Sequence, residues 1–132
     1  MAARERLAQQ VDFLAEALAR LEDALAMDES EIVRDAVIKR FEFTFEMAWK
    51  AMYRWLAWNE VDVPQEAFRV LPRAFSAGLV DDDAAWTAIR RARNLTSHTY
   101  DAKKAVEVAA TARAEAPRFR TLLERLRADL AA

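Results

Sequence analysis

The sequence has no cysteine, one glycine, three prolines and one histidine among its 132 residues. Without cysteine, the chain can form neither a disulfide framework nor a thiol nucleophile, and with a single histidine it cannot build a zinc site of the usual Cys/His type. The shortage of glycine and proline argues against a fold rich in tight turns and favours few, long secondary-structure elements. The lone histidine, His98, therefore needs a separate explanation.

Long apolar runs are also missing. No stretch of about 18 apolar residues occurs, and the charged start MAARERLAQQ lacks the apolar segment of a signal peptide. These features predict a cytoplasmic protein that does not contact a membrane. The formal net charge of −2 gives the chain as a whole no attraction for nucleic acid, so any RNA-binding site must be a local basic patch. We treat residues 1–132 as a single domain with one core.

Apolar residues at helical spacing are present in the first and last parts of the chain. Near the N-terminus they recur in steps of four and three, at Leu7, Val11, Leu14, Leu18, Leu21 and Leu25. Near the C-terminus the same steps give Ala105, Ala109, Ala112, Ala116, Phe119, Leu123, Leu126 and Leu130. This spacing is typical of helices that pack on other helices.

The segment FEFTFEMAW, residues 41–49, alternates apolar and polar residues as a half-buried strand does. Its surroundings favour a helix instead, because apolar residues keep a helical spacing from Val33 to Leu56 and no Gly or Pro interrupts residues 30–60. Asp28 and Ser30 are candidate caps for this helix, which should run to about Asn59. A helix that is apolar on more than one side must be covered on more than one side, so we expect it at the centre of the fold or against a second subunit.

Breaks in the pattern predict the remaining elements. Pro64 suits the first turn of a third helical stretch, Gly78 suits its end, and Pro72 should divide that stretch into two short pieces. The acids of residues 81–83 offer caps for a fourth helix, and Pro117 should kink the last one. The fold class is therefore all-α: an antiparallel up-and-down bundle of four long helices and a short helical pair.

Basic residues concentrate around the single histidine. Arg90, Arg91, Lys103 and Lys104 flank the motif RNLTSHTYD of residues 93–101. The Asn, Thr and Ser residues of the motif favour caps and turns, so we expect one helix to end here and the next to begin near Thr99 to Asp101. Lysines in a first helical turn oppose the helix dipole, and together with free backbone N–H groups they would form a phosphate site. The alternative is a set of ordinary solvated surface charges.

His98 is the candidate base of this cluster. Neighbouring positive charge disfavours the imidazolium form, so a neutral ring can accept a proton from a ribose 2′-hydroxyl before in-line attack on the adjacent phosphate. In a continuous helix, Arg93 and His98 would point about 140° apart, so a break between them is required to bring both to one site. A structural or incidental histidine is the alternative.

Three stretches together resemble a known family. RDAVIKRFEFTFEMAWK, AFSAGLVDD and RNLTSHTYD, in that order, are similar to the HEPN family, in particular to its branch of nucleotidyltransferase substrate-binding proteins. The resemblance runs from about residue 5 to residue 130. It implies a HEPN-like helical bundle that forms a homodimer and is encoded beside a minimal nucleotidyltransferase of the MNT type.

The resemblance also implies roles for individual residues. Arg93, Asn94 and His98 match the motif of HEPN toxins that act as metal-independent endoribonucleases, with sites at the dimer interface and RNA as substrate. Tyr100 occupies the position to which the cognate transferase attaches AMP in order to silence such a toxin. The implied Arg-x4-His-x-Tyr chemistry requires no metal and no other cofactor.

Two other functions remain open at this point. The chain can be a non-catalytic subunit that binds a nucleotide or another substrate for a two-component nucleotidyltransferase, as the branch name implies. It can also be a dimeric scaffold in which the motif only packs.

Overall fold

A computed structural model describes the whole chain, Met1–Ala132, as five α-helices and one short 3-10 helix, with no β-strand. In chain order the elements are α1 (Ala3–Leu25), α2 (Glu31–Trp58), α3 (Ala67–Ser76), α4 (Asp83–Leu95), the 3-10 helix η1 (Thr96–His98) and α5 (Ala102–Ala131). The predicted all-α fold class is confirmed. None of the helices combines the length and the apolar character needed to cross a membrane.

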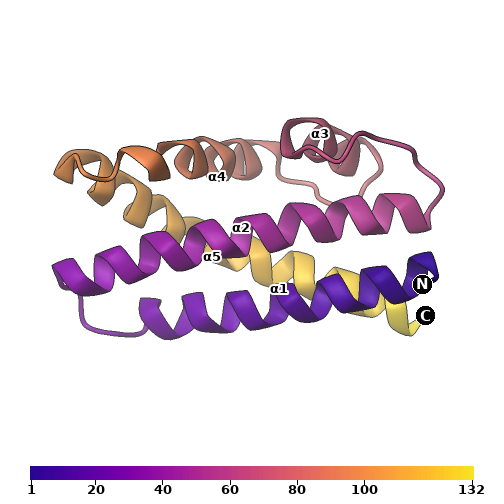
Figure 1. Ribbon diagram of the computed structural model, residues 1–132, viewed down its shortest axis with the longest axis horizontal. Coiled ribbons are helices and arrows are strands. Elements are labelled where there is room, and N and C mark those ends of the chain that lie inside the picture. The colour runs from indigo at the N-terminus through magenta and orange to yellow at the C-terminus, as the bar shows by residue number, and fades with distance from the viewer.

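The helix α2 lies at the centre of the bundle (Figure 1). It runs antiparallel to α1, its other neighbours include α4 and α5, and α3 packs on its C-terminal part. The expectation that this helix is covered on more than one side is therefore confirmed. The α1–α2 turn and the α4–α5 connection lie at one end of the bundle, whereas both chain termini lie at the other end (Figure 1).

Apolar residues from all the helices form one continuous core. The predicted seam of α1 is buried except for Leu25, which is half-buried. In α2, Phe41 and Phe45 are buried while Phe43 is 52% exposed, because positions two apart on a helix point in nearly opposite directions. That geometry explains the alternation that imitates a strand. Burial of each large aromatic side chain stabilises the fold by about 1.5–3 kcal/mol.

Phe119 of α5 connects three helices. Its ring meets Phe41 of α2 at a centroid distance of 6.0 Å and Trp86 of α4 at 5.6 Å, both edge to face. Such aromatic pairs add about 0.5–1.5 kcal/mol each to the burial of their surfaces. This cluster holds α4, and with it the start of the motif region, against the centre of the bundle.

The helix caps follow the sequence closely. The Ser30 hydroxyl accepts a hydrogen bond from the Val33 backbone N–H at 3.0 Å, and the Asp82 carboxylate accepts one from Ala85 N–H at 2.9 Å. Gly78 has a φ of 80°, the left-handed conformation that ends a helix and that glycine adopts without strain. The predicted cap candidates thus include the residues that serve as caps.

The prolines behave differently from what we expected. Pro72 lies inside the single helix α3, so the predicted pair of short pieces is wrong, and Pro64 lies three residues before that helix rather than in its first turn. The lost hydrogen bond and the steric clash of an internal proline cost about 3 kcal/mol. Burial of Val70, Leu71 and Ala74 offsets this cost and holds both halves in one helix. The helix α5 likewise continues through Pro117, and the kink predicted there stays a prediction.

Candidate functional site

The motif region forms the connection between α4 and α5. The helix α4 ends at Leu95, η1 follows, and α5 begins at Ala102, so the predicted break within RNLTSHT is confirmed. The Thr96 hydroxyl donates to the Arg93 carbonyl at 2.7 Å, and the Thr99 hydroxyl donates to the Thr96 carbonyl at 3.2 Å. These bonds satisfy carbonyl groups that lose their helical partners where α4 ends.

Asp101 caps the start of α5. Its carboxylate oxygen accepts hydrogen bonds from the backbone N–H groups of Lys103 at 2.9 Å and Lys104 at 3.4 Å. The sequence led us to expect free N–H groups at this helix start, and that expectation is wrong because Asp101 already provides the anion. Lys103 and Lys104 therefore have their side chains, and not their backbone N–H groups, available to an external anion.

The Arg93 side chain reaches back to the middle of α2. Its Nη2 and Nε atoms lie 3.2 and 3.4 Å from Oε1 of Glu46, in an ion pair whose two side chains are each about one-third exposed. The other carboxylate oxygen of Glu46 accepts a hydrogen bond from the Trp49 indole at 3.2 Å. Glu46 thus fixes the direction of Arg93 and leaves its Nη1 atom without a protein partner.

Glu46 is the residue that our reading of the sequence missed. It follows the buried Phe45 and precedes Ala48 and Trp49, within a stretch that we interpreted only through its apolar residues. A charged side chain in the middle of an apolar helix requires a polar partner, because an unpaired, partly buried charge costs free energy. That rule was the available signal. It predicts that a cation lies opposite Glu46 but does not identify that cation as Arg93.

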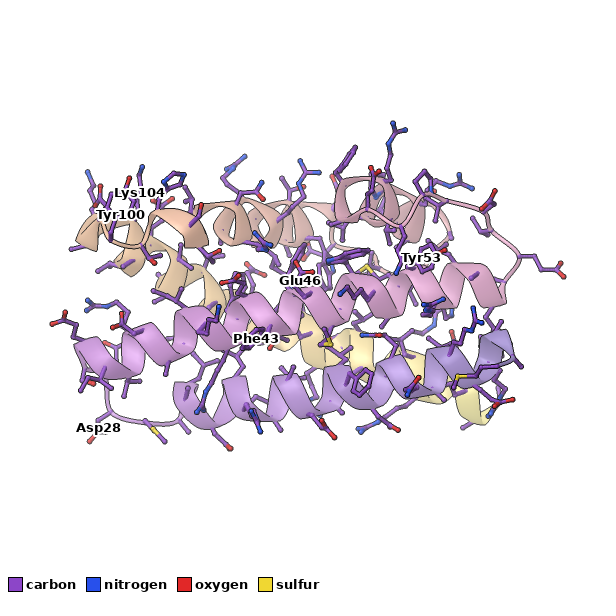
Figure 2. All side chains as sticks on the ribbon, viewed as in Figure 1. Asp28, Phe43, Glu46, Tyr53, Tyr100 and Lys104 are labelled. Carbon is purple, nitrogen blue, oxygen red and sulfur yellow. The ribbon has the colours of Figure 1, made fainter.

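His98 and Tyr100 lie at the surface of the connection. The two rings meet edge to face, with centroids 6.1 Å apart, and Tyr100 is 85% exposed. Figure 2 shows Tyr100 and Lys104 together at the end of the molecule that also carries Asp28, whereas Glu46 lies in the middle. The His98 side chain is exposed and forms no hydrogen bond or ion pair within the chain.

The predicted catalytic residues Arg93, Asn94 and His98 differ in their contacts within one chain. No hydrogen bond connects Arg93 with His98, and the exposed Asn94 side chain has no hydrogen-bond partner in the protein. A single chain presents the guanidinium on the α2 side of the connection and the imidazole at its outer surface.

The predicted phosphate-binding cations are unpaired. Arg91 and Lys103 are exposed, Arg90 and Lys104 are half-buried, and none of the four forms an ion pair with a carboxylate. Elsewhere in the chain, Arg113 and Arg118 have carboxylate partners, whereas Arg6, Arg34 and Arg127 have none. The cations near His98 thus remain available to an external anion.

Comparison with known proteins identifies relatives over most of the chain. Residues 9–128 match the family model described as nucleotidyltransferase substrate binding protein like. A curated protein of Haemophilus influenzae named "Probable ribonuclease HepT" is 41% identical over 85 residues. That match spans 58% of this chain and 58% of the relative.

Two solved structures share both the fold and a substantial part of the sequence. One, from Haemophilus influenzae, is described as revealing the fold of a substrate-binding domain of a nucleotidyltransferase. It is 32% identical to this chain and has a TM-score of 0.77, and the match covers 89% of this chain and 98% of that chain. The other, from Thermus thermophilus, is 31% identical, has a TM-score of 0.69, and the match covers 90% and 99% of the two chains. The chain therefore belongs to the nucleotidyltransferase substrate-binding protein-like family, the HEPN branch that its motifs resemble.

Proposed function

We propose that the protein is a homodimeric HEPN-type toxin, a metal-independent endoribonuclease that a cognate MNT-type nucleotidyltransferase silences. The observation that carries this proposal is an exposed His98 at a helix break, with no hydrogen bond or ion pair of its own, flanked in the sequence by four cations that have no carboxylate partner. The name of the curated Haemophilus influenzae relative agrees with ribonuclease activity.

In the proposed reaction, a ring nitrogen of His98 takes the proton of a ribose 2′-hydroxyl. The 2′-oxygen attacks the adjacent phosphorus, the bond to the 5′-oxygen breaks, and that oxygen takes up a proton as it leaves. The products are a 2′,3′-cyclic phosphate and a 5′-hydroxyl. Arg93 stabilises the negative charge of the transition state, and Asn94 orients the substrate by hydrogen bonding.

A dimer explains how separated groups form one site. Within one chain Glu46 holds Arg93, while His98 is exposed and has no hydrogen-bond partner. Two connections that meet across a twofold axis bring the imidazole of one copy near the guanidinium of the other. Arg90, Arg91, Lys103 and Lys104 of both copies then surround the substrate backbone.

Silencing acts through Tyr100 in this proposal. Its 85% exposure leaves the hydroxyl accessible to a partner enzyme. The Tyr100 oxygen attacks the α-phosphorus of ATP, loses its proton and releases pyrophosphate, which leaves AMP on the ring. Because this ring lies against His98, the added phosphate and purine occupy the space that RNA needs.

A second candidate is a non-catalytic subunit that binds a nucleotide or another substrate for the transferase. Two observations favour it: the ion pair between Arg93 and Glu46, which occupies part of the guanidinium, and the description of the related solved structure as a substrate-binding domain. In this function the cations around His98 bind phosphate groups without breaking a bond.

Cleavage of labelled single-stranded RNA by the purified protein, in buffer containing EDTA, distinguishes the two candidates. We expect His98→Ala to lower the rate at least ~100-fold, because general-base catalysis contributes about 10²–10⁴-fold. Arg127→Ala, which removes an exposed arginine remote from the motif in sequence, is the control and should cleave like the parent. Equal rates for the parent and His98→Ala would reject the ribonuclease and leave the binding subunit.

A further inference from the structure

The outer surface of α3 and α4 joins exposed aromatic rings to unpaired arginines. On α3, Phe68 and Phe75 are 55% and 43% exposed, and the guanidinium of Arg69 lies 5.5 Å from the centre of the Phe68 ring. Neither Arg69 of α3 nor Arg90 and Arg91 of α4 form an ion pair with a carboxylate. Exposed rings beside free cations are the combination that single-stranded nucleic acids recognise.

A small pocket lies where the two helices meet. Its volume is about 100 Å³, and Pro72, Phe75, Asp83, Trp86, Thr87 and Arg90 contribute to its lining. Pockets for drug-sized ligands measure ~300–1,000 Å³, so this one suits a single flat group. The carboxylate of Asp83 disfavours a phosphate inside the pocket and can accept a hydrogen bond from the amino group of a base.

The exposed positions of α4 connect this pocket with His98. Thr87, Arg91 and Asn94 are exposed and follow one another in steps of four and three, so they lie along one side of the helix. His98 lies eight positions after Arg90, five of them in α4 and three in η1, which corresponds to roughly 13 Å along the chain. A strand bound at His98 can therefore run along α4 and reach the pocket within a few nucleotides.

We propose that the α3–α4 surface, defined by Phe75, Arg90 and Arg91, binds the single strand of RNA that flanks the cleavage position, with one base stacked on Phe75 in the pocket. This inference rests on the proposed function, because it takes RNA as the substrate at His98. The substrate class is then unpaired RNA: the rigid stacking of a duplex does not release a base into a pocket of this kind.

Phe13 of α1 provides a matched control for Phe75. The two side chains are 44% and 43% exposed, so their truncation removes similar surface, yet Phe13 contributes to a separate groove between α1 and α2. We would measure the anisotropy of a labelled single-stranded RNA bound to full-length His98→Ala protein, with Phe75→Ala or Phe13→Ala added. Stacking contributes about 1–3 kcal/mol per base, so Phe75→Ala should weaken binding at least ~5-fold and Phe13→Ala should not weaken it.

The salt dependence of the same binding tests the arginines. The logarithm of the RNA association constant falls linearly with the logarithm of the salt concentration. For a single strand, the magnitude of this slope decreases by about 0.7 for each phosphate that the protein no longer neutralises. We expect this change for Arg90→Gln and for Arg91→Gln, and no change for Arg20→Gln on the α1–α2 groove. The same RNA annealed into a duplex should bind the parent and Phe75→Ala equally.

The outcomes separate this inference from the ribonuclease proposal. If the parent does not cleave RNA but its binding depends on Phe75, the nuclease fails and the RNA surface stands. If the parent cleaves RNA while Phe75→Ala and Phe13→Ala bind equally well, the RNA surface alone is overturned. The RNA surface would also be overturned if Phe75→Ala lowered the molecular mass of the protein in solution without changing its RNA affinity. In that case the α3–α4 surface would be a contact between subunits.

Discussion

Two helix connections lie at the same end of the bundle, the α1–α2 turn and the α4–α5 connection (Figure 1). Both reverse the chain, and both start the next helix with a side-chain cap, Ser30 in one and Asp101 in the other. Their charges differ. The first turn of α2 carries Glu31, which the helix dipole favours, whereas the first turn of α5 carries Lys103 and Lys104, which it disfavours.

This difference shows which features the fold does not need. The α1–α2 turn reverses the chain with a cap, an acidic first turn and the contacts of Arg113 with Glu29 and the Leu25 carbonyl. The α4–α5 connection adds unpaired cations, an exposed histidine and an exposed tyrosine, none of which contributes to the core. Residues that oppose local stability without serving the core are expected at functional sites. This comparison agrees with our proposal that the α4–α5 connection carries the function.

Substitution of Tyr100 should have the largest effect. We expect Tyr100→Phe to abolish neutralisation and to leave no AMP on the protein after co-expression with the transferase, because the acceptor oxygen is gone. Mass spectrometry of peptides that contain residue 100 measures the modification. Tyr53→Phe, on the half-buried Tyr53 of α2, is the control and should be modified like the parent. Neutralisation of Tyr100→Phe by an active transferase would rule out this mechanism.

Substitution of Glu46 tests whether Arg93 must be held in place. Glu46→Gln removes the ion pair while keeping the shape of the side chain. We expect the rate of RNA cleavage to fall about 10-fold with an unchanged KM, because a mispositioned Arg93 guanidinium stabilises the transition state less while substrate binding is retained. Each partner is about one-third exposed, so the free energy of unfolding should fall by only about 1 kcal/mol.

The control for this experiment is Glu29→Gln. Glu29 pairs with Arg113 at 3.4 Å near the α1–α2 turn, in the connection that we interpret as structural. Its loss should leave kcat unchanged. A similar fall in kcat for both variants would show that the effect of Glu46 is general and does not act through Arg93.

Loss of the two caps should affect stability alike and function differently. Ser30→Ala and Asp101→Ala each leave backbone N–H groups at a helix start without a partner, so each should lower the free energy of unfolding by about 1 kcal/mol. Asp101→Ala also removes an anion beside Lys103 and Lys104, so it should raise RNA affinity. Urea unfolding and RNA titration measure the two effects. Unchanged RNA affinity for Asp101→Ala would contradict the assigned role of the lysines.

Charge reversal in the first turns should have the smallest effect on stability. Lys103→Glu should stabilise the fold by about 0.3–1 kcal/mol through the helix dipole and should weaken RNA binding. Glu31→Lys should destabilise the fold by a similar amount and leave RNA binding unchanged. Thermal unfolding at low salt resolves shifts of this size. Loss of stability in Lys103→Glu would show that this lysine supports the fold.

The elements of the bundle were largely predictable because their causes are local. The steps of four and three between Leu7 and Leu21 predicted the buried side of α1, and Ser30 and Asp82 proved to be caps. Pro72 misled us because its cost is local while the packing that offsets it is not. Similarly, Asp101 was correctly included in the expected start of α5, but its occupation of the Lys103 and Lys104 N–H groups was not foreseen.

The sequence by itself determined the fold class, the position of the helix break and the cluster of cations around His98, because helical periodicity, capping and charge are properties of neighbouring residues. Only the tertiary structure decided that Arg93 pairs with Glu46, 47 positions earlier in the chain. Such contacts depend on how helices distant in sequence pack against one another, and periodicity within one helix does not specify its partner across the core.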